Sequence, residues 1–238
     1  MIDNQLKTAT VAAAFSVTAQ IIIEKLIASG TRVVAYGRKG DEERVEALEA
    51  KYNGKLTVLL GNLADELESK QLLQQTLDIL GTIDAHYHCS GVFTWEHWET
   101  IEVRKVAELY EANFLTAFVF GREVYKAMKL QKGGAMVFVS ARDTIRNIQA
   151  GFGPYMVSKM ALNGMVESMA AEGYEYGIKV NAVLPTVINT PVNRKVMPEV
   201  APNGFVDPNE MADFMIEISQ PSKTNLSGSL IAFSSSMQ

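Results

Sequence analysis

Segments with the pattern of β-strands alternate with segments of helical periodicity along the whole chain. Short runs rich in β-branched residues have strand character, at Leu6–Ala12, Thr31–Tyr36, Lys55–Leu60, Ile83–His88, Ala135–Ser140, Ile178–Leu184 and Ser229–Phe233. Stretches with a period of about 3.6 residues lie between them, at Ala19–Ser29, Glu42–Tyr52, Glu66–Leu80, Val103–Leu130, Tyr155–Tyr176 and Asn209–Ser219. The alternation predicts an α/β fold with a doubly wound parallel sheet of about seven strands and helices on both faces.

Length and composition narrow the class of protein further. The 238 residues suit one domain, residues 1–238, and 47% of them are hydrophobic, which is enough for a full core. The net charge of −5 leaves no basic surface for nucleic acid or anionic lipid. Cys89 has no second cysteine for an internal disulfide, and the apolar run Val11–Phe15 is too short to cross a membrane. We expect a cytoplasmic globular protein with neither nucleic acid nor a membrane as partner.

Ligands of parallel sheets bind beyond the carboxyl ends of the strands, near the position where the strand order reverses. The residues that follow strands are therefore the candidates for a site. The longest segment without a predicted helix or strand is Thr186–Pro208, which carries four of the seven prolines. A connection of this length is typical of a lid or a binding loop, and Asn189 within it is a candidate for substrate contact.

A tyrosine and a lysine four residues apart follow the fifth predicted strand. A helix places Tyr155 and Lys159 on one face. An ammonium close to a phenol favours the phenolate, so we expect Lys159 to lower the pKa of Tyr155 and to make it a proton donor or acceptor near neutral pH. Tyr125 and Lys129 have the same spacing but do not follow a strand, and we interpret them as a pair on a helix surface.

The order of the elements, the Tyr155–Lys159 helix and the following sequence KVNAVLPT resemble the short-chain dehydrogenase/reductase family over nearly the whole chain. Two segments, AVLPTVINTPVNRKVMPE and SGSLIAF, resemble the dihydropteridine reductases within that family. The resemblance implies a Rossmann-like fold, a nicotinamide dinucleotide as hydride donor and a small-molecule substrate. It also implies a homodimer or homotetramer that pairs through Val103–Leu130 and Tyr155–Tyr176, the latter with a small or apolar face at Met160, Gly164, Met165 and Met169.

The resemblance assigns roles to single residues of this chain. Tyr155 would pass a proton to the substrate, and Lys159 would tune that phenol and hold the ribose next to the nicotinamide. Asn113 would keep a water relay to the lysine, or alternatively bond within its own helix. Contacts with the cofactor are implied for three further positions, Asn62, Gly91 and Pro185.

The chain departs from the family where the first predicted strand ends. The three glycines of the family's phosphate-binding turn correspond to Ala13, Val17 and Ala19. Alanine in a left-handed conformation costs roughly 1–2 kcal/mol, and a β-branched valine there is an outlier. We expect a turn of different path, with the Val17 side chain in space that phosphates would use. Ser16 or Thr18 can still cap the following helix, whose N–H groups attract an anion, and their hydroxyls can donate to phosphate.

Two further positions differ from the family. An acidic residue after the second strand binds the ribose of NAD, whereas Arg38 and Lys39 suit the 2′-phosphate of NADP(H), with ordinary exposed charge as the alternative. The family serine lies thirteen residues before the tyrosine, where this chain has Arg142, and Ser140 lies two residues away. We interpret the serine as absent. Arg142 and Asp143 either replace it as donor or orienting charge toward the substrate, or form a solvated ion pair.

Aromatic and imidazole side chains lie in and after the fourth predicted strand. Trp95 either stacks on a flat substrate or packs beneath the long helix, and packing is the interpretation we favour for Trp98. His86 and His88 alternate onto one face of their strand. A fourth metal ligand is not evident beside them and Cys89, so we expect hydrogen-bonded histidines and no metal.

Three functions are compatible with these residues. The first is an NADPH-dependent reductase that transfers hydride to a small carbonyl or planar heteroaromatic substrate. The second is a cofactor-free relative that acts as scaffold, regulator or partner subunit, motivated by the lost glycines and serine. The third is non-redox proton chemistry by Tyr155 and Lys159 in a cleft without cofactor. The first serves as the working hypothesis.

Overall fold

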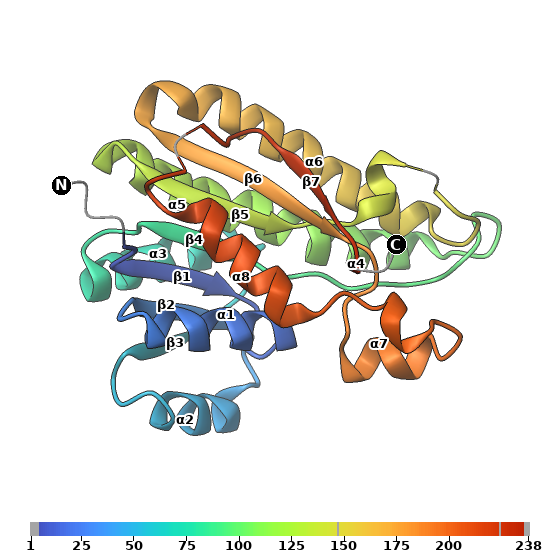
Figure 1. The fold of residues 1–238 in the computed structure, drawn as a ribbon, viewed down its shortest axis with the longest axis horizontal. Helices are drawn as coiled ribbons and strands as arrows, with labels where there is room; N and C mark the ends of the chain where they lie inside the picture. The colour runs from blue at the N-terminus through green and yellow to red at the C-terminus, as the bar shows by residue number, and fades with distance from the viewer. Residues whose placement is uncertain (1–4, 147, 224, 236–238) are drawn as a thin grey trace.

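The computed structural model describes residues 5–146, 148–223 and 225–235, and within them seven parallel strands form one sheet in the order β3-β2-β1-β4-β5-β6-β7. The strands are β1 (Thr8–Ala12), β2 (Arg32–Gly37), β3 (Leu56–Leu60), β4 (Ala85–His88), β5 (Gly134–Val139), β6 (Ile178–Pro185) and β7 (Leu230–Phe233). Because all of them run in one direction, their carboxyl ends meet at the same edge (Figure 1). The predicted doubly wound parallel sheet is confirmed.

Helices cover both faces of this sheet (Figure 1). One face packs against α1 (Val17–Ala28), α2 (Glu42–Ala50) and α8 (Pro208–Ser219). The other packs against α3 (Glu66–Leu80), α5 (Thr116–Gln131) and α6 (Gly153–Gly173). The strands β1 and β6 are buried along their whole length, as strands of a parallel sheet covered on both faces must be. Among the described helices, none combines the length and the apolar character needed to span a bilayer.

The predicted helix Val103–Leu130 is interrupted. It consists of α4 (Val103–Tyr110), one turn of π-helix (Glu111–Leu115) and α5. The amide of Thr116 donates to the carbonyl of Glu111, five residues back, which is the bond that defines the wider turn. The π turn spans only five residues, too few to stand out from the helical periodicity on either side of it, so the sequence pattern did not reveal it.

The predicted loop Thr186–Pro208 contains elements of its own. A short helix, α7 (Pro191–Val196), follows Thr190, whose hydroxyl accepts from the amide of Asn193. A cap followed by proline at the first helical position favours a helix start. Further along, a 3₁₀ turn (Pro202–Gly204) and a bridge between Ile188 and Val206 close the segment on itself. Six residues are too few for periodicity to predict such a helix.

Candidate active site

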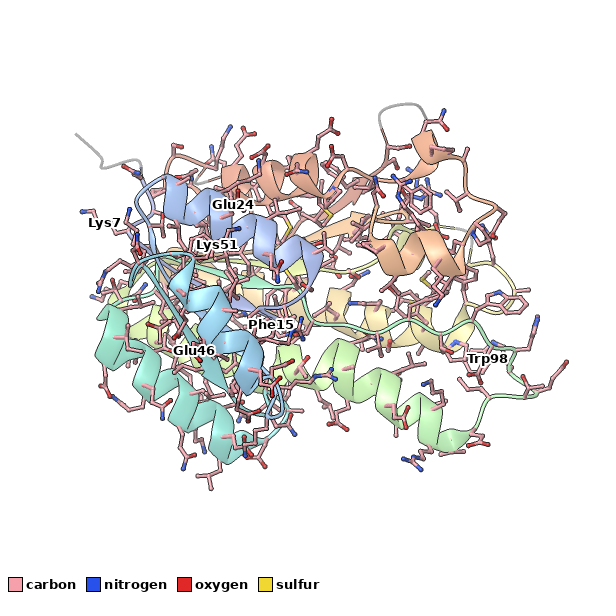
Figure 2. The ribbon with its side chains drawn as sticks, turned by 90° about the horizontal axis from the view of Figure 1, so that it is seen from below. Lys7, Phe15, Glu24, Glu46, Lys51 and Trp98 are labelled. Carbon is pink, nitrogen blue, oxygen red and sulfur yellow. The ribbon has the colours of Figure 1, made fainter. Side chains whose placement is uncertain are left out.

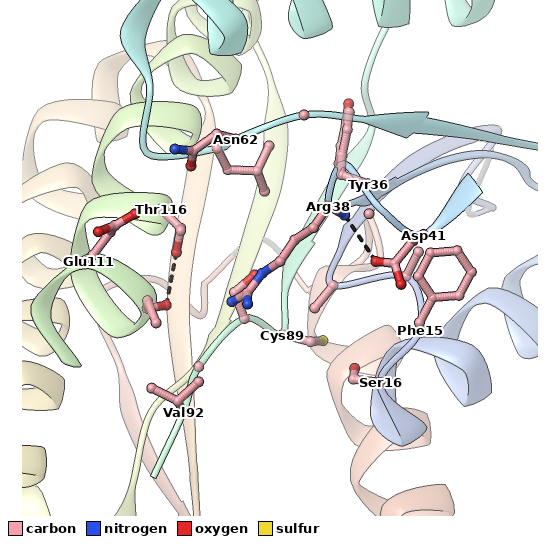
Figure 3. Close-up of a pocket in the computed structure, with 18 of the residues that line it drawn as sticks. Phe15, Ser16, Tyr36, Arg38, Asp41, Asn62, Cys89, Val92, Glu111 and Thr116 are labelled. Atoms are coloured by element: carbon pink, nitrogen blue, oxygen red, sulfur yellow. Dashed lines mark hydrogen bonds between the residues drawn. The ribbon is translucent and has the colours of Figure 1, made fainter. Parts of the chain in front are cut away.

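A cleft of about 860 Å³ opens at the carboxyl ends of β1 to β4 (Figure 3). β1 and β4 are neighbours in the sheet although two strands separate them in the chain, so the cleft lies where the strand order reverses. The segments that follow the four strands line it, together with one wall from α4, the π turn and α5: Ala13–Ser16, Gly37–Lys39, Gly61–Leu63, Cys89–Val92, Lys105, Glu108, Glu111, Ala112 and Thr116.

Ala13, in the turn after β1, keeps the left-handed conformation that a glycine would adopt, so the expected turn of different path is wrong at this residue. Ala13 has φ 63°, and the amide of Ala14 donates to the carbonyl of Tyr36 at 2.8 Å. Ser16 is the N-cap of α1, because its hydroxyl accepts from the amide of Ala19 at 3.3 Å. The first turn of α1 therefore opens on the cleft, where its N–H groups favour an anion.

Two expectations about this turn are wrong. Val17 is the first residue of α1 and lies outside the cleft lining, so its side chain does not take the space expected for phosphates. Thr18 is 6% exposed and packs inside, so its hydroxyl does not face the cleft. Both residues belong to α1, which begins at residue 17, and the cleft lining ends before them at Ser16.

Charged side chains border the cleft beside β2. Arg38 extends into the cleft in Figure 3, and its amide donates to Asp41 at 3.2 Å. Arg44, which the sequence analysis did not single out, pairs with Asp41 at 2.7 Å and lies over the ring of Phe15 at 4.2 Å. Lys39 reaches the same cleft but pairs with Glu68 at 2.8 Å. Arg38 is therefore the better placed of the two predicted cations.

Asn62 also lies in the cleft lining, after β3. Its side-chain carbonyl accepts from the amide of Ala64 at 2.9 Å. The side-chain NH₂ of Asn62 stays available as a donor in the predicted contact.

Beside β4 the polar groups are buried and bonded to one another. Asn113, in the π turn, accepts from the amide of Val92 at 2.8 Å and donates to its carbonyl and to the hydroxyl of Ser158, both at 3.0 Å. Gly91 is in the cleft wall, and a Cβ there would lie 2.8 Å from Oδ1 of Asn113 and 2.9 Å from Nζ of Lys159. The wall can hold these groups only because residue 91 is glycine.

Lys159 and Tyr155 are both on α6, as the spacing predicts, but they do not act on each other as expected. The ammonium of Lys159 donates to the carbonyl of Val139 at 2.9 Å, and burial lowers its pKa to about 8. Burial raises the pKa of Tyr155, and the nearby carboxylate of Asp143 raises it further. The expected lowering of the Tyr155 pKa by Lys159 is therefore wrong for this structure, because desolvation of the phenol dominates.

The ring of Phe93 lies against Tyr155, whereas the predicted tryptophans, Trp95 and Trp98, lie against Gly151 and Gly153 at the entry to α6. Phe93 meets the Tyr155 ring edge-on at 5.1 Å. The ring of Phe152 lies 5.4 Å from that of Phe93. Trp95 and Trp98 are 58% and 66% exposed, so neither packs beneath the long helix. Figure 2 shows Trp98 projecting from the coil after β4 at the end of the molecule opposite Lys7.

The position of the family serine holds no substitute hydroxyl. Ser140 is 3% exposed and bonds to the carbonyl of Lys159 at 3.4 Å, which directs it into the core. Arg142 opens a 3₁₀ turn after β5 and pairs with Asp143 at 3.3 Å. The expected ion pair is present, with both side chains half-buried.

Several predicted residues lie outside the cleft lining: Asn113, Tyr155 and Lys159, Trp95 and Arg142, and also Pro185 and Asn189. Pro185 is buried at the end of β6, next to Phe233 of β7 in the sheet. Asn189 accepts from the guanidinium of Arg194. Tyr125 and Lys129 are on α5, where Lys129 lies over the ring of Tyr176 instead.

The histidines of β4 are hydrogen-bonded rather than arranged around a metal. The imidazole of His86 is hydrogen-bonded to the hydroxyl of Thr10 at 2.9 Å, and the imidazole of His88 to the hydroxyl of Thr116 at 3.2 Å. Within the described ranges, no three His, Cys, Asp or Glu side chains are placed to hold a metal ion.

Sequence reasoning missed Ser158, Phe93 and Arg44. Ser158 directly precedes Lys159 in the sequence, so the sequence already placed it on the same helix as the lysine. Phe93 lies two residues beyond Gly91, in the coil that lines the cleft. Arg44 gave no signal, because the acidic residues around it made it look like a solvated charge.

The family model for short chain dehydrogenase matches residues 7–201. The chain belongs to the short-chain dehydrogenase family. An uncharacterized oxidoreductase of Thermotoga maritima is 28% identical over 144 residues, which cover 60% of this chain and 56% of that protein. A tropinone reductase homolog of Arabidopsis thaliana is 26% identical over 213 residues, which cover 85% of this chain and 60% of the homolog. The chain thus spans little more than half the length of these two relatives.

Solved structures agree on the fold. A variant of actinorhodin polyketide ketoreductase, solved with NADPH, has a TM-score of 0.88 at 19% identity, with 97% of this chain and 96% of that chain covered. At this identity the likeness shows the fold alone. It supports the Rossmann-like architecture of the short-chain family for the whole described sheet.

Proposed function

We propose that this chain is an NADPH-dependent reductase that delivers hydride to a small carbonyl or planar heteroaromatic substrate. One observation carries the proposal: Gly91 and Val92 line the open cleft on one side and contact Asn113 and Lys159 on the other. A dinucleotide in the cleft would therefore lie against the same wall that supports the tyrosine helix.

The residues of the cleft fit a dinucleotide. The left-handed turn at Ala13 and the capped start of α1 leave N–H groups for a diphosphate. Arg38 extends toward the place of a 2′-phosphate, with Arg44 behind it on the ring of Phe15. The NADPH in the solved ketoreductase supports this choice by likeness of fold. When bound, NADPH supplies a hydride, which no side chain of the protein can do.

Tyr155 is the proton donor in this proposal. Burial and Asp143 raise the pKa of its phenol, which keeps the proton on the oxygen at neutral pH. A protonated phenol suits reduction, in which the substrate oxygen or nitrogen gains a proton from the enzyme. Lys159 and Asn113 keep the wall beside it in place through Val139, Val92 and Ser158.

The substrate is reactive and flat in this proposal. Ser140 bonds into the core and Arg142 pairs with Asp143, so neither of the two positions considered for the family serine supplies a hydroxyl to polarise a carbonyl. The ring of Phe93 beside Tyr155, with Phe152 next to Phe93, provides aromatic surface for a planar ring. A quinonoid or pterin-like compound meets both conditions.

A homodimer or homotetramer is part of the proposal. Phe118 of α5 and Val157 and Met160 of α6 are 39%, 37% and 44% exposed, and Gly164 has open space at its Cβ position. The other two methionines predicted for this face, Met165 and Met169, pack partly against the core. Light scattering at micromolar concentration is expected to give at least twice the 26.2 kDa of one chain; a monomer contradicts this part.

Separate titrations with NADPH and NADH, followed by nicotinamide fluorescence, test the function. We expect NADPH to bind in the micromolar range and more tightly than NADH, and to be oxidised on addition of quinones or pterins. Absence of binding of either nucleotide at millimolar concentration overturns the proposal and favours the cofactor-free alternative.

A further inference from the structure

A line of buried hydrogen bonds runs from β1 through β4 to the cleft wall. Thr10 lies beside His86 in the sheet, and its hydroxyl is 2.9 Å from Nδ1 of that imidazole. Nε2 of His86 is 3.4 Å from Nδ1 of His88, and Nε2 of His88 is 3.2 Å from the hydroxyl of Thr116. Thr10 and the two histidines are at most 1% exposed, and Thr116 borders the cleft.

The hydroxyl of Thr116, at one end of this line, determines which group donates and which accepts in each bond. The hydroxyl of Thr116 donates to the carbonyl of Ala112 at 3.0 Å, so toward His88 it accepts. His88 then carries its proton on Nε2, and because burial keeps the imidazole neutral, its Nδ1 is an acceptor. His86 in turn donates from Nε2 and accepts from Thr10, whose second contact, with the carbonyl of Ala85, is longer at 3.5 Å.

The line ends on the π turn that carries Asn113. In a regular helix the amide of Thr116 would bond to the carbonyl of Ala112, but here it bonds to Glu111. The hydroxyl of Thr116 gives Ala112 a donor in its place. Asn113, the next residue, is thereby presented to Val92.

We propose that His86 and His88 are positioning residues: through Thr116 they hold the π turn in the register that lets Asn113 fix the Gly91–Val92 wall of the cleft. A chain of aligned hydrogen bonds in an apolar surrounding polarises each member and strengthens the whole. Phe138 supplies that surrounding, with its ring 6.1 Å from His86 and 5.7 Å from His88. The effect on cofactor affinity rests on the proposed function, whereas the hydrogen-bond line does not.

Nitrogen-15 NMR of the histidine side chains in the ligand-free protein is the first test. We expect His86 and His88 both neutral at pH 7, with the proton on Nε2 in each. A proton on Nδ1 of either ring, or a charged ring at this pH, overturns the proposal without any variant.

A matched pair at Thr116 is the second test. Thr116→Val keeps the shape and removes the hydroxyl, whereas Thr116→Ser keeps the hydroxyl. We expect amide exchange at Val92 to become about tenfold faster in the valine variant, relative to Val137 in the core, and to stay within about twofold in the serine variant. An unchanged ratio of Val92 to Val137 exchange in Thr116→Val overturns the proposal, because general destabilisation moves both amides together.

Thr10→Val and Thr10→Ser repeat the comparison at the far end of the line, and they replace the first pair should Thr116→Val not fold. Thr10 is buried, lies outside the cleft lining and contacts His86, so it perturbs the line at a residue that borders neither the cleft nor Val92. NADPH affinity is measured on the same proteins. Weaker binding in Thr10→Val supports the positioning role, because Thr10 lies outside the cleft lining whereas Thr116 borders it. A parent protein that binds no NADPH removes the proposed function, while the NMR and exchange results still decide the role of the histidines.

Discussion

Beside β2 and β3 the cleft is bordered by charged side chains that stay partly or largely exposed, whereas beside β4 and α6 there are buried groups that bond across elements. Lys39, Glu68, Arg44 and Asp41 pair with one another while their side chains remain between 22% and 68% exposed. Asn113, Ser158 and Lys159 are at most 5% exposed, and each bonds across elements. We call the first region the charged end and the second the buried end.

The difference has energetic consequences. Exposed ion pairs contribute about 0–1 kcal/mol, so side chains at the charged end can change partners when an anion arrives. A buried polar group that loses its partner costs about 1–3 kcal/mol, so the buried end keeps one arrangement. Affinity for a phosphate can therefore be adjusted at the charged end without disturbing the groups next to Tyr155.

Removal of the Tyr155 hydroxyl is expected to have the largest effect. Tyr155→Phe should lower NADPH-dependent turnover by about 10²–10⁴-fold, the usual contribution of a general acid, and leave NADPH affinity within about threefold. Steady-state rates and fluorescence titration measure the two quantities. Tyr125→Phe is the matched control, since Tyr125 has the same spacing to a lysine on α5 and its hydroxyl has no partner among the described residues. Equal turnover of parent and Tyr155→Phe removes the tyrosine from the chemistry.

Acid should lower the free energy of unfolding of the protein through the two buried histidines of β4. Burial lowers the pKa of His86 to about 3 and that of His88 well below its usual value. Below about pH 6.5 the unfolded chain binds protons on these imidazoles and the folded chain does not, so stability falls as the pH falls. For His86 alone the free energy of unfolding should drop by about 2 kcal/mol between pH 6.5 and pH 5, with His88 adding in the same direction.

Urea unfolding at a series of pH values checks this slope, and histidine NMR checks its cause. His86→Gln removes one titrating group and should flatten the slope, provided that the variant folds. A His86 ring that gains its proton near pH 6 in the folded parent contradicts the prediction directly.

The sheet could be predicted from the sequence because every strand and helix contributes its own evidence. Each strand and each long helix produces its own pattern, and the order of patterns alone determines the parallel arrangement. Tyr155 and Lys159 were placed correctly on one helix for the same reason, since four residues of spacing fix their common face.

The electrostatic state of the site was beyond the sequence. Whether Lys159 lowers the pKa of Tyr155 depends on what buries the phenol, and Phe93 and Asp143 reach it from two other segments. The π turn at Asn113 likewise leaves no periodic trace. Such features arise from contacts between distant residues, which neither spacing nor composition records.

Arg38 tests the charged end. Arg38→Gln should weaken NADPH binding by about 10–100-fold and NADH binding by less than threefold, because a hydrogen bond to a charged group is worth about 1.5–3 kcal/mol and only NADPH has the 2′-phosphate. Lys39→Gln is the control: Lys39 is engaged by Glu68, so its loss should have a clearly smaller effect. Equal losses for NADPH and NADH in Arg38→Gln contradict a role in discrimination. Fluorescence titration at several salt concentrations measures both.

The smallest expected effect is at the turn after β1, where the two ends meet. Ala13 adopts φ 63°, so Ala13→Gly should raise the free energy of unfolding by about 1 kcal/mol through removal of the strained Cβ. Ala14, whose φ is not positive, is the matched control, and Ala14→Gly should destabilise by roughly 0.5–1 kcal/mol.

NADPH affinity in Ala13→Gly decides what the missing glycines mean for the cleft. The backbone already has the conformation of a glycine turn, so the bound diphosphate meets the same N–H groups in both proteins and the affinity should change by less than twofold. A gain above tenfold would show that the Cβ of Ala13 obstructs the phosphate. In that case the protein would keep the shape of the cleft but bind NADPH weakly, and the groups of the buried end would have no hydride donor beside them.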